Sequence, residues 1–229
     1  MIRKVIRIFA VLILLAGAAL LAFPFVNEVA YDRQAQNVIE DYEDKTEDLY
    51  LPELRALMEE YNEDLFENGQ ADFKDAWSYQ PASFDLTEWG FEDNMIGYLD
   101  IPAMDVKLPV YLGATVDNMA KGAVHLTETS LPIGGENTNC VIAAHRGFWG
   151  KPMFIDIEKL KAGDEITFTN IWETLTYRVA ETKVIRPNEV DQVKIQPGRD
   201  LITLITCHPL GHNYQRYVVY CERVADAAA

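Results

Sequence analysis

The sequence predicts a mainly β domain that follows two helices and an apolar N-terminal segment. From residue 95 onward, short runs rich in β-branched and aromatic residues alternate with turn residues, and no clear long helical pattern intervenes. Residues 27–69 are instead charged and helical in composition, and residues 8–26 carry no charge. These three observations favour an all-β sandwich or barrel over residues 95–224, with a short tail at 225–229.

The strands of this domain are expected where apolar runs are bounded by turns. They cover Ile96–Ile101, Val106–Val110, Cys140–Ala144, Glu165–Thr169, Thr174–Lys183, Leu201–Thr206 and Tyr217–Arg223. Two short helices are expected between them, at Asp117–Lys121 and Pro152–Leu160. With 229 residues, one such domain plus a peripheral segment is the natural organisation.

The N-terminus has the pattern of a membrane anchor. A basic tip, residues 1–7, precedes the uncharged run 8–26, and acidic residues follow it. A spanning helix needs roughly 20 apolar residues, and the positive-inside rule leaves the basic tip in the cytoplasm. We therefore expect a single-pass protein of the cell membrane with an extracellular domain. A cleaved signal peptide is the alternative, but its small-residue motif Ala16-Gly-Ala18 comes too early in the run.

Residues 27–69 are expected to form a pair of helices packed on the main domain. Pro52 fits the first turn of the second helix, and Gly69 fits its C-terminal cap. The apolar residues of this helix recur at helical spacing, at Leu54, Leu57, Met58, Tyr61 and Leu65. Packing explains this stripe without a further function. Residues 70–94 then lack any period, and long aperiodic loops tend to be functional or disordered.

The charge balance excludes one class of partner. Acidic residues outnumber basic residues by 36 to 20, which gives a net charge of -16. Nucleic acid binding requires a basic face, so no nucleic acid partner is expected. The same charge is compatible with a protein that faces solvent, basic peptides or cations.

Cys207 stands where a predicted buried strand ends. The run Leu201–Ile205 is β-branched and apolar, and a proline and a glycine then break the chain into a loop. The next strand begins at Tyr217, which places Arg216 at its start. A cysteine nucleophile works as the thiolate and needs a cationic environment, which a guanidinium supplies. Cys140 and Cys221 lie in apolar runs and are expected to be core residues, with a disulfide between them as the less favoured alternative.

His145 is the candidate proton carrier, because it ends another apolar run. Three other histidines compete for that role. His125 is expected to be a satisfied structural residue or an auxiliary of the site. His208 follows Cys207 directly, and neighbouring strand residues point to opposite faces. His212 lies in the loop, where recognition or solvent exposure is expected.

The pattern around these residues resembles that of a known family. Thr203-Leu-Ile-Thr-Cys207, with Arg216 nine positions later and His145-Arg-Gly upstream, resembles the sortases, the cysteine transpeptidases of Gram-positive cell surfaces. Three further segments, Gly97–Pro102, Lys107–Tyr111 and Thr129–Gly135, resemble landmarks of the class C branch, which polymerises pilins. The resemblance runs from about residue 95 to 223 and rests on five motifs in the right order.

The resemblance implies a closed eight-stranded barrel and a thioacyl mechanism. Cys207 would cleave an LPXTG-like sorting signal between threonine and glycine, with Arg216 at the oxyanion or the substrate backbone and His145 moving protons. Thr206 would assist near the thiol or be a buried strand residue. The acyl group would pass to a pilin lysine, or to a peptidoglycan amine in a housekeeping enzyme. No cofactor and no metal site is expected.

Class C relatives also carry a lid with an Asp-Pro-aromatic motif over the active site. Asp75-Ala-Trp77 resembles it, with alanine in place of proline, so that Asp75 would approach Arg216 and Trp77 would cover Cys207. Class C relatives usually carry a hydrophobic segment after the catalytic domain as well. This sequence shows none there.

Two other classes of function stay open from the residues alone. One is a different Cys/His hydrolase or an L,D-transpeptidase, although the Ser-His-Gly-x-x-Cys-like run of the latter is absent. The other is a non-enzymatic anchored surface domain in which Cys207 is merely a core residue.

Overall fold

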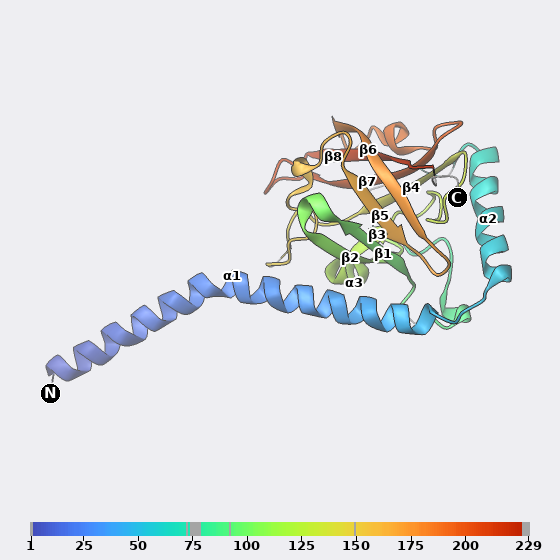
Figure 1. The fold of residues 1–229 in the computed structure, drawn as a ribbon. Coiled ribbons are helices and arrows are strands. Elements are labelled where there is room, and N and C mark those ends of the chain that lie inside the picture. The colour runs from blue at the N-terminus through green and yellow to red at the C-terminus, as the bar shows by residue number, and fades with distance from the viewer. Residues whose placement is uncertain (1, 72, 74–78, 92, 149, 226–229) are drawn as a thin grey trace.

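Eight strands close into a barrel, and the N-terminal helices pack against its outside (Figure 1). The computed structural model describes residues 2–71, 73, 79–91, 93–148 and 150–225. The strands are β1 (Met95–Ile101), β2 (Val106–Leu112), β3 (Ala123–His125), β4 (Thr138–Ala143), β5 (Glu165–Thr169), β6 (Thr174–Ile185), β7 (Asp200–His208) and β8 (Gln215–Arg223). They follow the order β1-β2-β3-β4-β7-β8-β6-β5, and β5 pairs back with β1.

All seven predicted strands are present, and the expected closed barrel of eight strands is confirmed. The eighth strand, β3, was not predicted from the sequence. It has only three residues, and all three are buried. The sequence therefore shows neither an alternation of apolar and polar residues nor a run long enough to indicate a strand. It pairs in parallel with β2 and antiparallel with β4, and these pairings close the barrel.

The helix predicted over Pro152–Leu160 is wrong. That segment instead forms successive turns and a short 3-10 helix, Ile157–Lys159. Met153 has a φ of 43°, which an α-helix cannot accommodate. Four of its apolar side chains are buried in the core all the same, those of Met153, Phe154, Ile157 and Leu160, whereas Ile155 is exposed. The other short helix, α3 (Val116–Lys121), forms as expected, with Thr115 accepting a cap hydrogen bond from the Asn118 N–H.

The first helix, α1 (Ile2–Thr46), is continuous from the apolar run into the part that packs on the barrel. The expected anchor and the first helix of the predicted pair are therefore one element. Its buried residues are Tyr31, Ala35, Ile39 and Tyr42, which line one face toward the barrel. Tyr42 donates a hydrogen bond of 2.9 Å from its hydroxyl to the Ile96 carbonyl. In length and composition, α1 alone among the described helices is apolar enough to cross a membrane.

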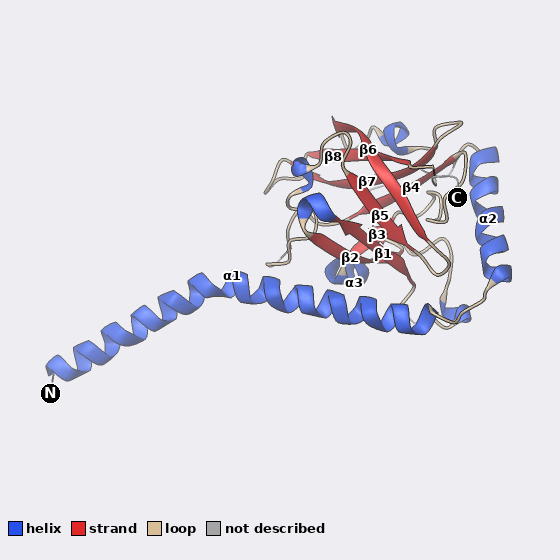
Figure 2. Cartoon of the chain, in the orientation of Figure 1, coloured by secondary structure: helices blue, strands red, loops and turns tan. Residues whose placement is uncertain are grey.

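The second helix, α2 (Pro52–Glu67), runs along the far side of the barrel from the N-terminal end of α1, as Figure 2 shows. It ends in a Schellman motif, in which Gly69 has a φ of 60° and the Gln70 N–H bonds the Leu65 carbonyl at 3.1 Å. Leu54, Met58 and Leu65 are buried, so the predicted packing role of the apolar stripe is confirmed. Leu57 departs from the predicted stripe and is 45% exposed.

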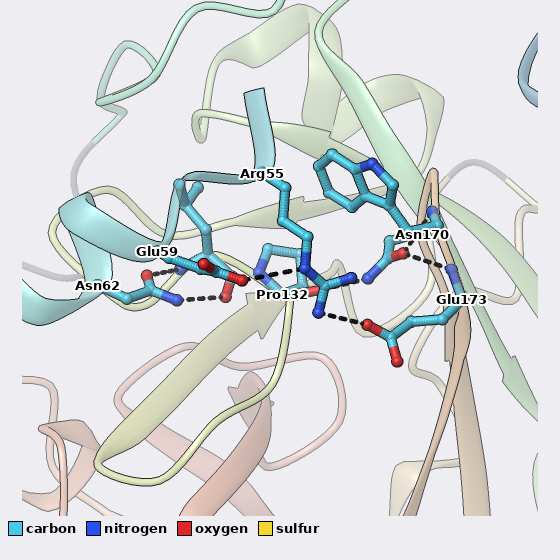
Figure 3. Close-up of polar contacts among 8 residues, drawn as sticks. Arg55, Glu59, Asn62, Pro132, Asn170 and Glu173 are labelled. Atoms are coloured by element: carbon cyan, nitrogen blue, oxygen red, sulfur yellow. Dashed lines mark hydrogen bonds and ion pairs between the residues drawn. The ribbon is translucent and has the colours of Figure 1, made fainter. Parts of the chain in front are cut away.

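Polar contacts fasten α2 to the barrel (Figure 3). Buried Asn62 donates from Nδ2 to the Leu131 carbonyl at 3.1 Å and accepts from the Leu131 N–H at 2.7 Å. Arg55 pairs with Glu173 at 2.8 Å, across the gap between α2 and the turn before β6. The helix is thus attached both by apolar packing and by hydrogen bonds to a buried backbone segment.

Candidate active site

Strands β7 and β8 place Cys207 and Arg216 side by side. In the antiparallel register of the two strands, Cys207 is the direct cross-strand partner of Arg216. Residues paired in this way carry their side chains on the same face of the sheet. The two residues that the sequence put at the ends of neighbouring strands therefore meet across the ladder.

His145 reaches the same place from the loop after β4. Strand β4 runs parallel to β7, with Ala143 opposite Ile205. Beyond the strand end, the Ala144 N–H bonds the Ile205 carbonyl at 3.3 Å, and Thr206 donates from Oγ1 to the Ala144 carbonyl at 2.7 Å. Thr206 is 4% exposed. Its hydroxyl thus continues the pairing of the two segments up to the residue before His145.

A pocket of about 260 Å³ brings the three residues together. Its lining includes His145, Cys207 and Arg216. The remaining lining residues are Tyr79, Ala114, Met119, Leu126, Ala143, Ala144, Ile205, Thr206 and Asn213. A thiol, an imidazole and a guanidinium therefore face one concave site with largely apolar walls, where electrostatic interactions are stronger than in bulk water.

The His145 ring is held on one side by Phe148. The two rings stack with centroids 4.6 Å apart and an interplanar angle of 14°. The His145 carbonyl accepts a hydrogen bond of 3.0 Å from the Phe154 N–H, which fixes the backbone. Partial burial lowers the pKa of His145 from its usual value, because it disfavours the charged imidazolium.

Arg216 is oriented by a carbonyl of the loop between β7 and β8 and by the carbonyl of the first residue of β8. Its Nη1 donates to the Asn213 carbonyl at 2.7 Å and to the Gln215 carbonyl at 2.9 Å. These bonds orient the guanidinium of Arg216, which lines the pocket.

Arg146 contacts the backbone of the site from outside the pocket lining, and it was not among the residues predicted from the sequence. Its side chain is 7% exposed, and its Nη2 pairs with Glu158 Oε1 at 2.6 Å. Its Nη1 lies 3.0 Å from His208 Nδ1 and donates to the Cys207 carbonyl at 3.5 Å. Arg146 thus links the residue after His145 to the backbone of Cys207. The available signal was its position inside the His145-Arg-Gly motif.

The other histidines lie outside the pocket lining. His125 is 1% exposed and donates from Nε2 to the carbonyls of Ser130 at 3.0 Å and Thr129 at 3.2 Å. Burial lowers its pKa to about 4. His125 is thus buried and hydrogen-bonded through Nε2, outside the pocket lining. His208 contacts Arg146 and Glu158, away from the pocket, as the strand alternation predicted.

The three cysteines have different environments. Cys140 is 3% exposed, Cys221 is 0% exposed, and both are free thiols, so the disulfide considered between them does not form. Burial raises the pKa of both thiols. Cys207 is only partly buried. A thiol that must react has to be reachable, and Cys207 alone of the three meets this condition.

Two further sequence predictions concern the lid and metal ions. Asp75 and Trp77 lie outside the described residues. Tyr79, in the same loop, lines the pocket. Within the described part of the chain, no group of histidine, cysteine, aspartate and glutamate side chains is arranged to hold a metal ion.

Comparison with known proteins gives consistent matches. The Sortase domain family matches residues 99–224. The structure of a pilus-related sortase C of Group B Streptococcus is 33% identical, with a TM-score of 0.72 over 81% of this chain and 96% of that one. Sortase C from Clostridium perfringens is 36% identical, with a TM-score of 0.70 over 83% of this chain and 99% of that one.

Two curated relatives also match this chain. Sortase A of Bacillus anthracis is 26% identical over 226 residues, which cover 99% of this chain and 98% of that protein. Sortase D of Bacillus subtilis is 28% identical over 131 residues, which cover 56% of this chain and 63% of that protein. The sortase A match and the structures named sortase C in the paragraph above therefore both resemble this chain over most of its length.

Proposed function

Because the chain belongs to the sortase family of cysteine transpeptidases, we propose that His145, Cys207 and Arg216 carry out its reaction on an LPXTG-like sorting signal. The observation that supports this assignment most directly is the shared pocket that all three residues line. The cross-strand pairing of Cys207 with Arg216 adds that the cation is held beside the thiol by the barrel itself.

In the first half of the proposed reaction, the Cys207 thiolate attacks the carbonyl carbon between threonine and glycine. The Arg216 guanidinium stabilises the oxyanion or holds the substrate backbone. The carbon–nitrogen bond to glycine then breaks, and imidazolium His145 gives its proton to the departing amine. The product is a thioester between the threonine carbonyl and Cys207.

In the second half, an amine resolves the thioester. His145, now neutral, takes a proton from the amine as it attacks the same carbonyl carbon. The carbon–sulfur bond breaks and Cys207 leaves as the thiolate, so the enzyme returns to its starting state. We propose a pilin lysine as the acceptor, supported by the likeness to a structure named as a pilus-related sortase C. A peptidoglycan amine, used by housekeeping sortases, is the second candidate, supported by the full-length match to a sortase A.

The apolar part of α1 is proposed to anchor the protein in the cell membrane as a single span. The supporting observations are its length, its hydropathy and the basic residues that precede it. This orientation would place the barrel, residues 95–224, outside the cell, where sorting signals are presented.

One experiment tests the assignment of the three residues. The full chain is incubated with an LPXTG-like peptide and candidate pilins, and mass spectrometry measures the thioester and the ligated product. Cys207→Ala should form neither, and His145→Ala and Arg216→Ala should each lose ligation. The exposed-loop variant His212→Ala should keep it. Retention of full activity by Cys207→Ala, with the barrel folded, would overturn the proposal.

A further inference from the structure

The apolar run of α1 leads directly into the part of the helix that packs on the barrel. None of its most apolar 18-residue stretch is buried, and Val26, at the end of the run, is 63% exposed. Tyr31, little more than one helical turn later, is 4% exposed. Because the helix is continuous through this point, there is no flexible linker between the proposed anchor and the barrel.

One loop of the barrel reaches the helix at the end of the apolar run. A Cβ atom at Gly150 would lie 2.9 Å from Asn27 Cβ and 3.6 Å from the Pro24 carbonyl oxygen, so the loop backbone is in close contact with this turn of α1. Figure 1 shows the same arrangement, with the yellow loop after β4 descending onto the blue part of α1.

This contact is reinforced on both sides. Lys151 places its Nζ 5.1 Å from the centre of the Tyr31 ring and donates to the Ala120 carbonyl at 2.6 Å. Phe148 and Lys151 exchange two backbone hydrogen bonds, of 3.0 and 2.9 Å, which close the loop into a tight turn. The turn closed by Phe148 and Lys151 is therefore held beside Pro24 and Asn27.

The depth of this turn follows from the geometry of a spanning helix. Membrane helices tilt by about 20° on average, so a segment that touches the helix from the side lies within a few ångströms of the depth of the residues it touches. Pro24 and Asn27 are at the end of the apolar run, which is the level of the outer headgroups if α1 is the anchor.

We propose that the turn closed by Phe148 and Lys151 rests on the outer leaflet of the bilayer. This inference depends on the anchoring role of α1 in the proposed function. The surroundings suit a lipid interface, because Phe148 and Ile155 border the groove against α1 together with the amphipathic side chain of Lys151. The contact joins the membrane to the proposed base, since the Phe148 ring stacks on His145.

The charge of the protein indicates how this contact is held. A net charge of -16 does not attract anionic lipids, and in the groove itself the carboxylate of Glu28 lies among the cations Arg146 and Lys151. The anchor and the apolar contact must therefore hold the turn at the surface, and a neutral phosphatidylcholine bilayer is a sufficient partner.

The test places a fluorophore at the turn in the full chain. Phe148→Cys and, separately, Lys151→Cys are labelled in a Cys207→Ala background, where Cys140 and Cys221 are buried. The chain is reconstituted in phosphatidylcholine vesicles that contain a lipid with a nitroxide on its headgroup. Quenching at either position should be several-fold stronger than at Glu136→Cys, an exposed control next to α2.

A matched insertion in α1 moves the barrel farther from the membrane surface without changing the sequence of the barrel. Seven helical residues added after Val26 lengthen the helix by about 10 Å, and quenching at position 148 should fall to the level of the control. Equal quenching at positions 148, 151 and 136 in the uninserted chain would overturn the inference.

Two further readings separate this inference from the proposed function. Flotation of the vesicles in a density gradient shows whether the chain is bound to them. If the chain does not float with the vesicles, the proposed anchoring role of α1 is wrong, and this inference is overturned with it. The proposed chemistry is tested independently, because thioester formation is measured in the unlabelled chain with Cys207 and does not depend on quenching at the turn.

Discussion

The Thr206 hydroxyl donates a hydrogen bond of 2.7 Å to the carbonyl of Ala144. This bond joins the residue before Cys207 to the residue before His145. The two segments are separated by 62 positions in the chain, and no regular ladder continues this far, since β4 ends at Ala143. A single buried side chain therefore helps to set how the proposed nucleophile and the proposed base lie relative to each other.

Thr206→Val should test this bond, because valine keeps the shape and removes the donor. It leaves the Ala144 carbonyl without that partner, at an expected cost of about 1–3 kcal/mol in the free energy of unfolding. Small displacements in an active site are expensive, so kcat should fall about tenfold or more while KM changes little. Thr206→Ser restores the donor and should recover most of the rate. An unchanged kcat in Thr206→Val would show that the bond does not position the site.

Arg146→Lys should slow the reaction although it keeps the positive charge. Lysine cannot reproduce the planar fork that contacts Glu158, His208 and the Cys207 carbonyl together. We expect kcat to fall about 10- to 100-fold with KM within about twofold, which steady-state kinetics would measure.

Lys159→Ala is the matched control for the Arg146 variant, because Lys159 pairs with Asp156 on the exposed surface of the same region. It should leave kcat unchanged. A purely structural role for Arg146 would instead appear as a lower melting temperature with normal kcat in the fraction that remains folded.

The pKa of His145 should lie below 6.5, because burial disfavours its charged form. Carbon-13 NMR of the imidazole, in a Cys207→Ala background that removes coupling to the thiol, would give the midpoint. Phe148→Ser exposes the ring, so the midpoint should move up toward 6.5. A midpoint at or above 6.5 in the chain with Phe148 intact would contradict the effect of burial.

His125 should make the protein less stable in mild acid. Its pKa is about 4 in the folded state against 6.5 for the free side chain. Above pH 6.5 neither state is protonated at this site, and as the pH falls from 6.5 to about 4 only the unfolded state gains the proton. The free energy of unfolding should therefore fall by roughly 3 kcal/mol over this range.

Urea denaturation across this pH range measures the effect of His125. His125→Gln should lose that part of the pH dependence, whatever its stability at neutral pH. Identical slopes in the variant and the parent chain would show that His125 is not the group responsible.

Asn62→Ala should weaken the attachment of α2 to the barrel. It removes both partners of the buried Leu131 backbone groups, so the free energy of unfolding should drop by about 2–4 kcal/mol. Urea denaturation measures this change. Glu63→Ala, on the exposed side of the same helix, should change it by less than about 0.5 kcal/mol. Equal values for the two variants would mean that packing alone holds α2.

Local pattern was sufficient for most of the elements. Strand β5 (Glu165–Thr169) was predicted with its observed bounds, because an alternating run between turns specifies a strand without reference to the rest of the chain. The segment Pro152–Leu160 was mispredicted because its apolar spacing serves the core while Met153 adopts a left-handed conformation. Only the packing of the finished barrel imposes that conformation.

The sequence by itself determined which chemistry the protein carries. Cys207 and His145 each follow an apolar run and Arg216 precedes one, and that placement depends only on local pattern and motif. The tertiary structure decided how they meet, through the pairing of β7 with β8 and of β4 with β7. It also recruited Arg146 and Thr206, whose hydrogen bonds join segments that are far apart in the chain. Contacts of that kind depend on three-dimensional packing, and no local pattern in the sequence records them.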